Sequence, residues 1–376
     1  MTITPRENLL RTLRCDGPEW IPLCPYLFPN ENPTEGVPPH LKDAFRASGG
    51  GLARAILQLV EHLGAEECML PVPAPATLVS DTCSFRSEDI GGGKTVSILS
   101  TPKGELRQTL ERREGFPPMV TERYMKTAGD AAALTEFFAS QYVKPNPAAL
   151  DSIKDARAAL GDKGILFCRT MGTPLGMCYR VYTEITDLVY LIADSPEVIN
   201  ALFARMEEKY FQLYQAMLDA APEIDAFLGM DDTSTTLISP DMFDTYNVAL
   251  TNRRADLCHD HSKLYLHHSC GLIRDLLPIY AKTRMDGVDA FTPPPVGNVT
   301  CAEGRKRLGP RYSMLSGLAS GLPSLKDDVI RGHVAKRFAD AQAAGGVALC
   351  VGGASLTFGA LEQIFAEGER LKRARA

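Results

Sequence analysis

The sequence predicts an α/β protein built as a (β/α)8 TIM barrel, mainly from the pattern of its second half. From residue 148 onward, short apolar runs of strand length alternate with longer segments of helical periodicity. Repeated units of this kind favour parallel strands covered by helices. A doubly wound open sheet is the alternative. No Gly-x-Gly-x-x-Gly motif opens a helix after a strand, so a dinucleotide-binding version of that sheet is disfavoured.

The first half is expected to supply an N-terminal extension, two more barrel strands and an insertion. Thr4–Leu13 has the spacing of an amphipathic helix, Ile21–Tyr26 reads as a strand, and Gly51–Leu63 is helical. Two alternating runs on either side of a Pro-Lys-Gly turn predict a β-hairpin over residues 95–110, inserted outside the barrel repeat. A helix is expected over Ala131–Ser140.

The second half supplies the remaining barrel elements, and we expect one barrel domain over residues 1–376. The predicted strands are Ile165–Met171, Ala226–Asp231, Leu264–Cys270, Val288–Phe291, Tyr312–Leu318 and Val347–Val351. The predicted helices are Ala148–Leu160, Ile185–Ala193, Pro196–Ala220, Pro240–Asp260, Leu272–Thr283, Lys326–Ala344 and Ala360–Arg373.

Composition restricts the class of protein. Hydrophobic residues make up 45% and charged residues 23% of the chain, which is the usual globular balance. The net charge of −6, without basic runs apart from Arg370–Arg375, argues against a nucleic-acid partner. No signal peptide or transmembrane run is visible, and ten cysteines without close pairing favour a reducing cytoplasm. We expect a cytoplasmic monomer or homodimer that uses cysteine as a core residue or a metal ligand.

Residues that bind ligands or metals gather at the carboxyl ends of the predicted strands. Barrel enzymes place their active sites at that face, so these side chains are expected to converge on one mouth. They are Arg169, Thr170, Asp231, Asp232, His268, Cys270 and Cys350.

The stretch Lys263–Gly271 is the strongest candidate for chemistry. Side chains of a strand alternate, so His268 and Cys270 are expected to point the same way as the buried Leu264 and Leu266. With Cys350 they make a three-ligand zinc site with an open fourth position. Two thiolates and a neutral imidazole cancel the charge of the ion, which favours holding a substrate thiolate over hydrolysing a bond.

Plainer interpretations stand beside this one. His268 and Cys270 also fit a satisfied buried histidine beside a core cysteine, and Cys350 alone is more often a core residue. Asp231 and Asp232 would also serve to cap the following turn. His267 points to the opposite face of its strand and is expected to be structural.

The motif His268-Ser-Cys-Gly271, followed by Cys350 eighty residues after Cys270, resembles the uroporphyrinogen decarboxylase-like superfamily. Within it, the likeness is to the zinc-dependent corrinoid (methylcobamide) methyltransferases. Other stretches similar to the superfamily are Thr4–Leu13, Pro18–Pro22, Thr101–Gly104, Gly229–Asp232 and Ile238–Phe243. The likeness therefore extends over nearly the whole chain.

This resemblance implies a fold, an activity and a set of roles. It implies a barrel that binds Zn²⁺ through His268, Cys270 and Cys350. It also implies transfer of a methyl group between a methylcobamide, carried by a corrinoid-binding partner protein, and a small-molecule donor or acceptor in one-carbon metabolism. Asp231 or Asp232 would orient the substrate or accept a proton. Arg169 and Thr170 are assigned to cofactor binding.

Several alternative activities stay open. Decarboxylases of the superfamily carry an arginine-rich N-terminal motif, whereas residues 26–36 contain no Arg or Lys, so a lyase acting on a tetrapyrrole is the weaker hypothesis. Methyl transfer from an aryl methyl ether, as in an O-demethylase component, or to tetrahydrofolate is possible within the same family. A non-catalytic protein with a structural zinc would need a fourth protein ligand.

Overall fold

The computed structural model describes residues 3–26, 36–46, 50–113, 118–318, 327–352 and 356–374. The chain divides into two compact units. The first, here called the barrel unit, comprises Met1–Pro75, Pro147–Thr170 and Leu218–Ala376, and the second, the insert unit, comprises Ala76–Asn146 and Met171–Met217. The single domain over residues 1–376 stays a prediction.

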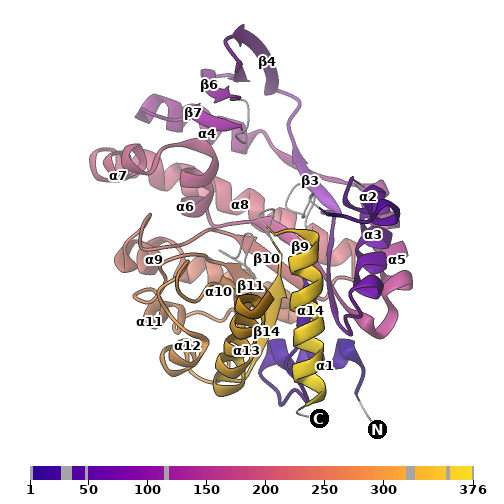
Figure 1. Ribbon diagram of the computed structural model, residues 1–376. Coiled ribbons are helices and arrows are strands. Elements are labelled where there is room, and N and C mark those ends of the chain that lie inside the picture. The colour runs from indigo at the N-terminus through magenta and orange to yellow at the C-terminus, as the bar shows by residue number, and fades with distance from the viewer. Residues whose placement is uncertain are drawn as a thin grey trace. The chain divides into compact units, whose positions relative to one another are not determined.

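Eight parallel strands form the barrel, which confirms the predicted fold class (Figure 1). They follow one another in the order β1-β14-β13-β12-β11-β10-β9-β2, and the two end strands, β1 and β2, contact each other, so the sheet is nearly closed. Closure of this kind excludes the doubly wound alternative. The strands are β1 (Leu23–Pro25), β2 (Cys68–Val72), β9 (Gly164–Met171), β10 (Ala226–Met230), β11 (Leu264–His268), β12 (Gly287–Phe291), β13 (Ser313–Gly317) and β14 (Val347–Val351).

Helices surround the strands on the outside of the barrel (Figure 1). They are α2 (Pro39–Arg46), α3 (Gly50–His62), α5 (Pro147–Leu160), α9 (Pro240–Tyr246), α10 (Val248–Asp260), α11 (Leu277–Tyr280), α12 (Cys301–Leu308), α13 (Asp327–Ala344) and α14 (Phe358–Arg373). A further helix, α8 (Pro196–Ala220), belongs to both units and has the predicted bounds.

Two helix predictions need correction. The helix predicted over Pro240–Asp260 is two helices, because Asn247 lies between them with φ −110°. The helix predicted over Leu272–Thr283 is the single turn α11. Side chains of other segments accept hydrogen bonds from three backbone N–H groups that precede it. Ser234 accepts from Leu272 N, and Asn298 accepts from the next two N–H groups. Helix α12 was not predicted.

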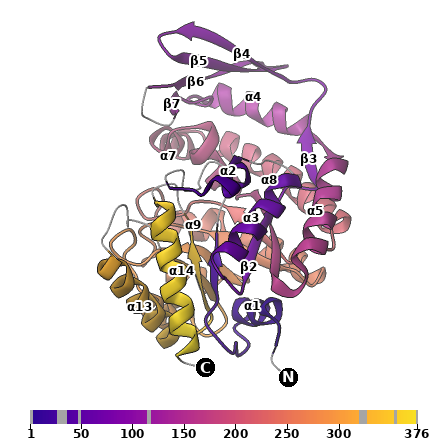
Figure 2. The same cartoon turned by 45° about the vertical axis from the view of Figure 1, so that its right-hand side comes forward.

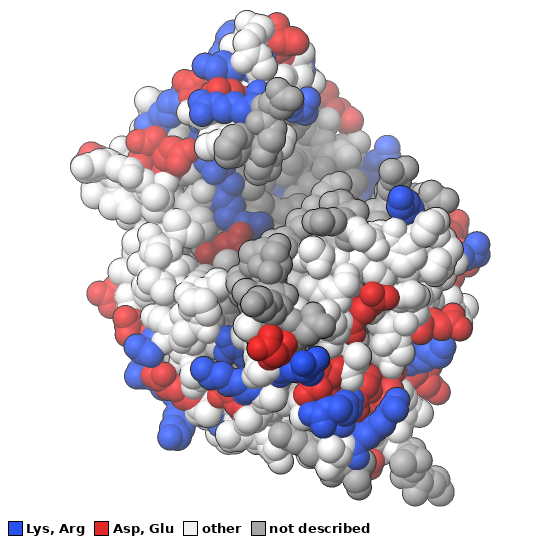
Figure 3. Space-filling view, viewed as in Figure 1, with Lys and Arg blue, Asp and Glu red and all other residues white. Residues whose placement is uncertain are grey.

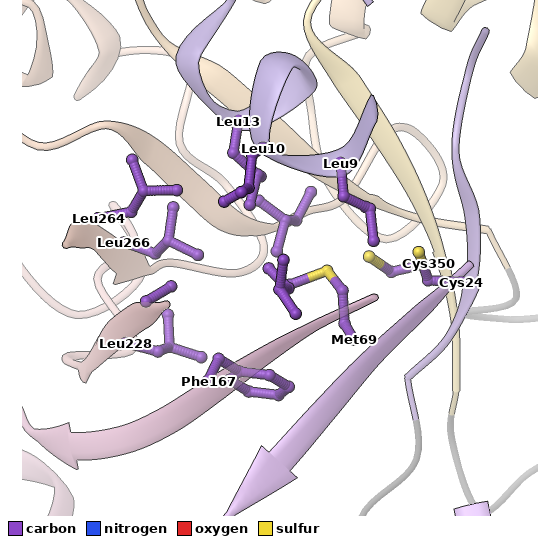
Figure 4. Close-up of a cluster of buried hydrophobic side chains, with 13 residues drawn as sticks. Leu9, Leu10, Leu13, Cys24, Met69, Phe167, Leu228, Leu264, Leu266 and Cys350 are labelled. Carbon is purple, nitrogen blue, oxygen red and sulfur yellow. The ribbon is translucent and has the colours of Figure 1, made fainter. Parts of the chain in front are cut away.

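The N-terminal extension is the helix α1 (Pro5–Arg14), which begins where the Thr4 side chain accepts a hydrogen bond from Glu7 N. Its apolar residues Leu9, Leu10 and Leu13 belong to the same buried cluster as the inward-facing residues of the barrel strands (Figure 4). These inward residues are Cys24, Met69, Ile165, Phe167, Ala226, Leu228, Leu264, Leu266, Leu315 and Cys350. Helix α1 and the barrel strands therefore share one apolar core.

The predicted β-hairpin is confirmed as β5 (Lys94–Thr101) and β6 (Gly104–Glu111), but it is part of a larger sheet. Strands β4 (Ser84–Gly91) and β7 (Met119–Glu122) pair antiparallel on its two sides. Every residue of β4 is exposed, so this strand lacks the apolar–polar alternation that reveals a half-buried strand. Figure 2 shows α4 (Ala128–Ala139) beside this sheet, and α4 contacts β5 and β6.

The remaining elements of the insert unit are a two-stranded sheet and three helical segments. Strands β3 (Ala76–Val79) and β8 (Tyr142–Pro145) pair antiparallel. After β9 come α6 (Pro174–Met177), a five-residue π-helix (Cys178–Tyr182) and α7 (Ile185–Asp194). No helix within the described part of the chain combines the length and apolar character needed to cross a membrane.

Charged side chains are interspersed on the face drawn in Figure 3, where blue and red groups alternate over the barrel unit. Among the residues described on that face, neither sign forms a continuous area of its own. The expected lack of a nucleic-acid partner stays a prediction.

Candidate metal centre

Three potential metal ligands lie together at the carboxyl end of the barrel. Asp232 follows β10, His268 is the last residue of β11, and Cys270 lies two residues further on. One ligand atom from each lies within 4.8 Å of the other two, and all three residues are half-buried. Zinc forms bonds of about 2.0 to 2.3 Å to such atoms, so an ion fits among them. The chemistry of the donors, an imidazole, a thiol and a carboxylate, also suits zinc.

The local sequence explains how β11 delivers two of these groups. Leu264 and Leu266 face the barrel interior, as predicted, and His268 continues their row past the apolar core. The strand ends at His268, two residues earlier than expected, so Cys270 lies in the following loop. The chain turns at Gly271, which has φ +89°, a conformation that side chains rarely adopt. Gly271 N donates to Thr292 Oγ1 at 3.1 Å, which holds this turn.

His268 lies between two carboxylates. Its Nε2 atom is 2.7 Å from Asp232 Oδ1, and its Nδ1 atom is 2.6 Å from Asp289 Oδ2. Burial lowers the pKa of His268, but the hydrogen bonds to Asp232 and Asp289 outweigh burial and leave the pKa well above its usual value. An ion that binds Nε2 must replace the contact of that atom with Asp232 and compete with a proton for it.

Asp289 is a residue of the candidate site that the sequence analysis missed. It is a buried acid on β12, with 1% of its surface exposed. A carboxylate that accepts from Nδ1 of a histidine fixes the orientation of the ring and presents Nε2 to a metal. The signal available in the sequence was a single acidic residue within the apolar run Val288–Phe291, which was assigned as an ordinary strand.

Backbone irregularity accompanies both carboxylates. Asp232 has φ +53° and Ala290, next to Asp289, has φ +57°. The register between β12 and β13 shifts between Asp289 and Phe291, which identifies a β-bulge. Bulges re-aim side chains, and non-glycine residues with positive φ gather at functional sites. One residue with positive φ, Asp232, thus contacts His268 directly. The other, Ala290, is next in the chain to Asp289, which also contacts His268.

Cys350 lies apart from this group of three ligand atoms. It is the register partner of Cys24 on the neighbouring strand β1, and Figure 4 shows the two cysteines side by side within the apolar core. Burial, and after it the charge of Asp289, raises the pKa of the Cys350 thiol well above its usual value. Asp289 therefore acts electrostatically on both His268 and Cys350. The role of Cys350 as a metal ligand stays a prediction.

Asp231 faces away from the group that contains its neighbour Asp232. It is fully buried, and its Oδ2 atom is 3.4 Å from Nδ1 of His267. His267 projects from β11 on the side opposite to His268, as predicted from strand alternation. The two aspartates thus have different surroundings, and only Asp232 reaches the candidate ligands.

Arg169 and Thr170 end strand β9. Thr170 is buried and its hydroxyl donates to Leu228 O of β10 at 3.1 Å. Arg169 continues the inward row of Ile165 and Phe167, and its charge acts to lower the pKa of Tyr26, which burial raises. The assignment of Arg169 and Thr170 to cofactor binding stays a prediction.

A separate cavity of about 790 Å³ lies away from these residues. Its lining includes Trp20 and Val347, which precede β1 and begin β14, and Lys372 near the end of α14. None of its lining residues belongs to the candidate ligand group. The cavity is at the amino ends of these strands, whereas barrel enzymes carry their chemistry at the carboxyl ends.

The chain belongs to the uroporphyrinogen decarboxylase (URO-D) family, whose model matches residues 96–311. The match includes Asp232, His268, Cys270 and Asp289 but ends before Cys350. Family membership confirms the superfamily resemblance that was read from the sequence. A comparison with curated proteins found no match.

A solved structure shares the fold over nearly the full chain. A methyltransferase from Methanosarcina mazei aligns with a TM-score of 0.62 and 15% identity, over 98% of this chain and 99% of that one. A candidate vitamin-B12-independent methionine synthase from Listeria monocytogenes aligns with a TM-score of 0.44 and 12% identity, over 94% of this chain and 99% of its own. At 15% identity, the likeness to the methyltransferase from Methanosarcina mazei shows the fold alone.

Proposed function

We propose that the protein is a zinc-dependent methyltransferase that moves a methyl group between a corrinoid on a partner protein and a thiol or methylated small molecule. The observation that carries the proposal is the meeting of His268, Cys270 and Asp232 at the carboxyl end of a URO-D family barrel. The fold shared with a methyltransferase over 98% of the chain supports the reaction class.

Each residue of the candidate site has its own role in this proposal. His268 and Cys270 would hold the ion, with Cys350 as the predicted third ligand. Asp232 would be the exchangeable carboxylate that gives way to a substrate. When bound, zinc supplies a Lewis acid that lowers the pKa of a substrate thiol. Asp289 keeps the ring of His268 oriented through Nδ1 and increases its basicity at Nε2.

Charge balance favours a thiol over water as the group that is activated. Thiolate ligands neutralise part of the positive charge of the ion. The pKa of a bound water molecule is therefore lowered less than at a site with three neutral imidazoles. Thiols need a smaller shift to ionise at neutral pH, because their usual pKa is about 8.5. A thiol acceptor is therefore the first substrate class to test.

Metal analysis tests the ligand assignment. We expect about one zinc per chain in the wild type, a large loss in Cys270→Ala and Cys350→Ala, and no loss in the control Cys24→Ala, since a tight site needs all three protein ligands. Cys24 is the matched control because it is a buried thiol beside Cys350 on the neighbouring strand. Equal zinc in wild type and Cys270→Ala would contradict the proposal, and equal zinc in Cys350→Ala would remove that residue from the site.

An activity assay tests the reaction class. Free methylcobalamin would be mixed with protein and candidate thiols, and loss of the methyl–cobalt absorption would be followed. The reverse direction would use reduced cobalamin with methylated donors, including aryl methyl ethers. We expect turnover by the wild type in one direction and at least a ~100-fold loss in Cys270→Ala, because an outer-sphere change alone already costs 10- to 100-fold. The absence of turnover with every donor and acceptor would contradict the proposal.

A further inference from the structure

A second polar cluster lies on the outer side of strands β10 and β11, behind the candidate ligands. It consists of Asp231, Thr233, His267, Ser269 and Tyr280, and is called here the outer polar cluster. All five residues are fully buried. Tyr280 comes from α11, so the cluster joins two strand ends to the helix that covers them.

Short contacts connect its members. Thr233 Oγ1 is 3.0 Å from His267 Nε2, 3.0 Å from Ser269 Oγ and 2.6 Å from the Tyr280 hydroxyl. Ser269 Oγ donates to Thr233 O at 2.7 Å and lies 2.7 Å from the same Tyr280 hydroxyl. Buried hydroxyls with several partners are held in one orientation, because leaving any of them unsatisfied is costly.

Aromatic packing encloses the cluster. The ring of His267 lies 5.6 Å from the ring of Tyr280 and 5.6 Å from that of Phe243. The rings of Tyr280 and Phe243 are 4.8 Å apart. Burial lowers the pKa of His267, so the ring is neutral at neutral pH and takes part through hydrogen bonding. The cluster is thus a tightly packed polar unit in an apolar surrounding.

Each hydroxyl of the cluster is next in the chain to a candidate ligand. Thr233 follows Asp232, and Ser269 stands between His268 and Cys270. Successive residues of an extended chain face opposite sides, so fixing one residue on the outer side orients its neighbour on the inner side. A non-glycine residue at φ +53°, as at Asp232, persists only where its surroundings hold it there.

We propose that Tyr280 is a positioning residue for the metal centre, because its hydroxyl clamps Thr233 and Ser269 together and thereby sets the separation of Asp232, His268 and Cys270. This inference rests on the proposed function, since it assigns a role to Tyr280 only if those three residues bind an ion. Tyr280 is not one of the three candidate ligands.

The test compares two tyrosine-to-phenylalanine variants. Tyr280→Phe keeps the ring contacts to Phe243 and His267 and removes only the hydroxyl. Tyr214→Phe is the matched control: its hydroxyl also lies on a fully buried tyrosine and donates to a backbone carbonyl, Met171 O, at 3.0 Å, and its helix α8 contributes no residue to the outer polar cluster. Zinc affinity would be measured by competition with a chromophoric chelator, and the visible spectrum of the Co²⁺-substituted protein would report ligand geometry.

We expect zinc to bind about 10- to 100-fold more weakly to Tyr280→Phe, the range seen when an outer partner of a ligand is removed. We also expect a changed Co²⁺ spectrum for this variant. Tyr214→Phe should keep the affinity and the spectrum of the wild type even if it unfolds more easily. Wild-type affinity and spectrum in Tyr280→Phe would overturn the inference.

A second pair of variants tests the same proposal if Tyr280→Phe does not fold. Thr233→Val removes the hydroxyl that Tyr280 contacts, whereas Thr233→Ser retains it. Weak zinc binding in Thr233→Val with recovery in Thr233→Ser would support the clamp, and equal affinity in the two would overturn it. If the wild type binds no zinc at all, the proposed function fails first and the positioning role fails with it.

Discussion

At the scale of single residues, His268 is the residue of the candidate site whose two ring nitrogens both contact carboxylates. Hydrogen bonds to Asp232 and Asp289 stabilise its charged form against the effect of burial. The pKa in the folded protein is raised, so this contribution to stability is complete below the unfolded value of about 6.5 and is lost as the pH rises through the folded value. A metal ion competes with the same proton, so its binding should strengthen over that pH interval.

Asp289→Asn tests this competition. Removing one carboxylate lowers the pKa of His268, so zinc affinity should depend less steeply on pH as the pH rises above about 6.5. At the highest pH measured, affinity should fall about 10- to 100-fold because the ring is less basic and less well oriented. Chelator competition at several pH values measures both effects. An unchanged affinity and pH dependence would contradict the role assigned to Asp289.

At the scale of elements, strand β12 carries a bulge where it reaches the site. Ala290 adopts φ +57° at the register shift between β12 and β13. The left-handed conformation costs a residue with a side chain about 1 to 2 kcal/mol, and glycine avoids this cost. The bulge is therefore a strained local feature beside the buried carboxylate that orients His268.

Ala290→Gly tests whether the strain is real. The greater freedom of glycine in the unfolded chain offsets part of the relief, so we expect the free energy of unfolding to stay constant or rise by up to about 1 kcal/mol. Ala348→Gly, in the regular part of β14, should lower it by about 0.5 to 1 kcal/mol or more. Urea midpoints compare the two. A loss in Ala290→Gly as large as in Ala348→Gly would argue against strain.

At the scale of the whole molecule, the proposed ion would connect the ends of strands from different βα units. Its ligands come from β10, from β11 and, as predicted, from β14, so the site exists only when the barrel is closed. Free zinc at 100 times its dissociation constant should then stabilise the folded protein by about 2.7 kcal/mol. The urea midpoint with zinc, compared with the midpoint in excess chelator, measures this gain. Cys270→Ala should show almost none, and an equal gain in this variant would locate the binding elsewhere.

The periodicity of the apolar residues and the spacing of the predicted elements were enough to predict the barrel. Apolar runs of strand length alternating with helical segments gave six of the eight strands nearly to the residue, because buried parallel strands need such runs. The same alternation placed His268 inward and His267 outward. The missed elements lack this signal: β4 is exposed on both faces, and the segment before α11 is held by Ser234 and Asn298 rather than by its own backbone.

The sequence by itself determined the fold class through its periodicity, the family through the resemblance of its motifs, and the pairing of His268 with Cys270 through their spacing of two residues. Only the tertiary structure decided which carboxylates serve the site. Asp231 and Asp232 are neighbours in the chain, yet a left-handed backbone at Asp232 brings one to His268 while the other meets His267. The roles of Asp289 and Tyr280 could not be predicted from the sequence for the same reason. Contacts between different elements depend on strand register and barrel closure, which no local sequence pattern contains.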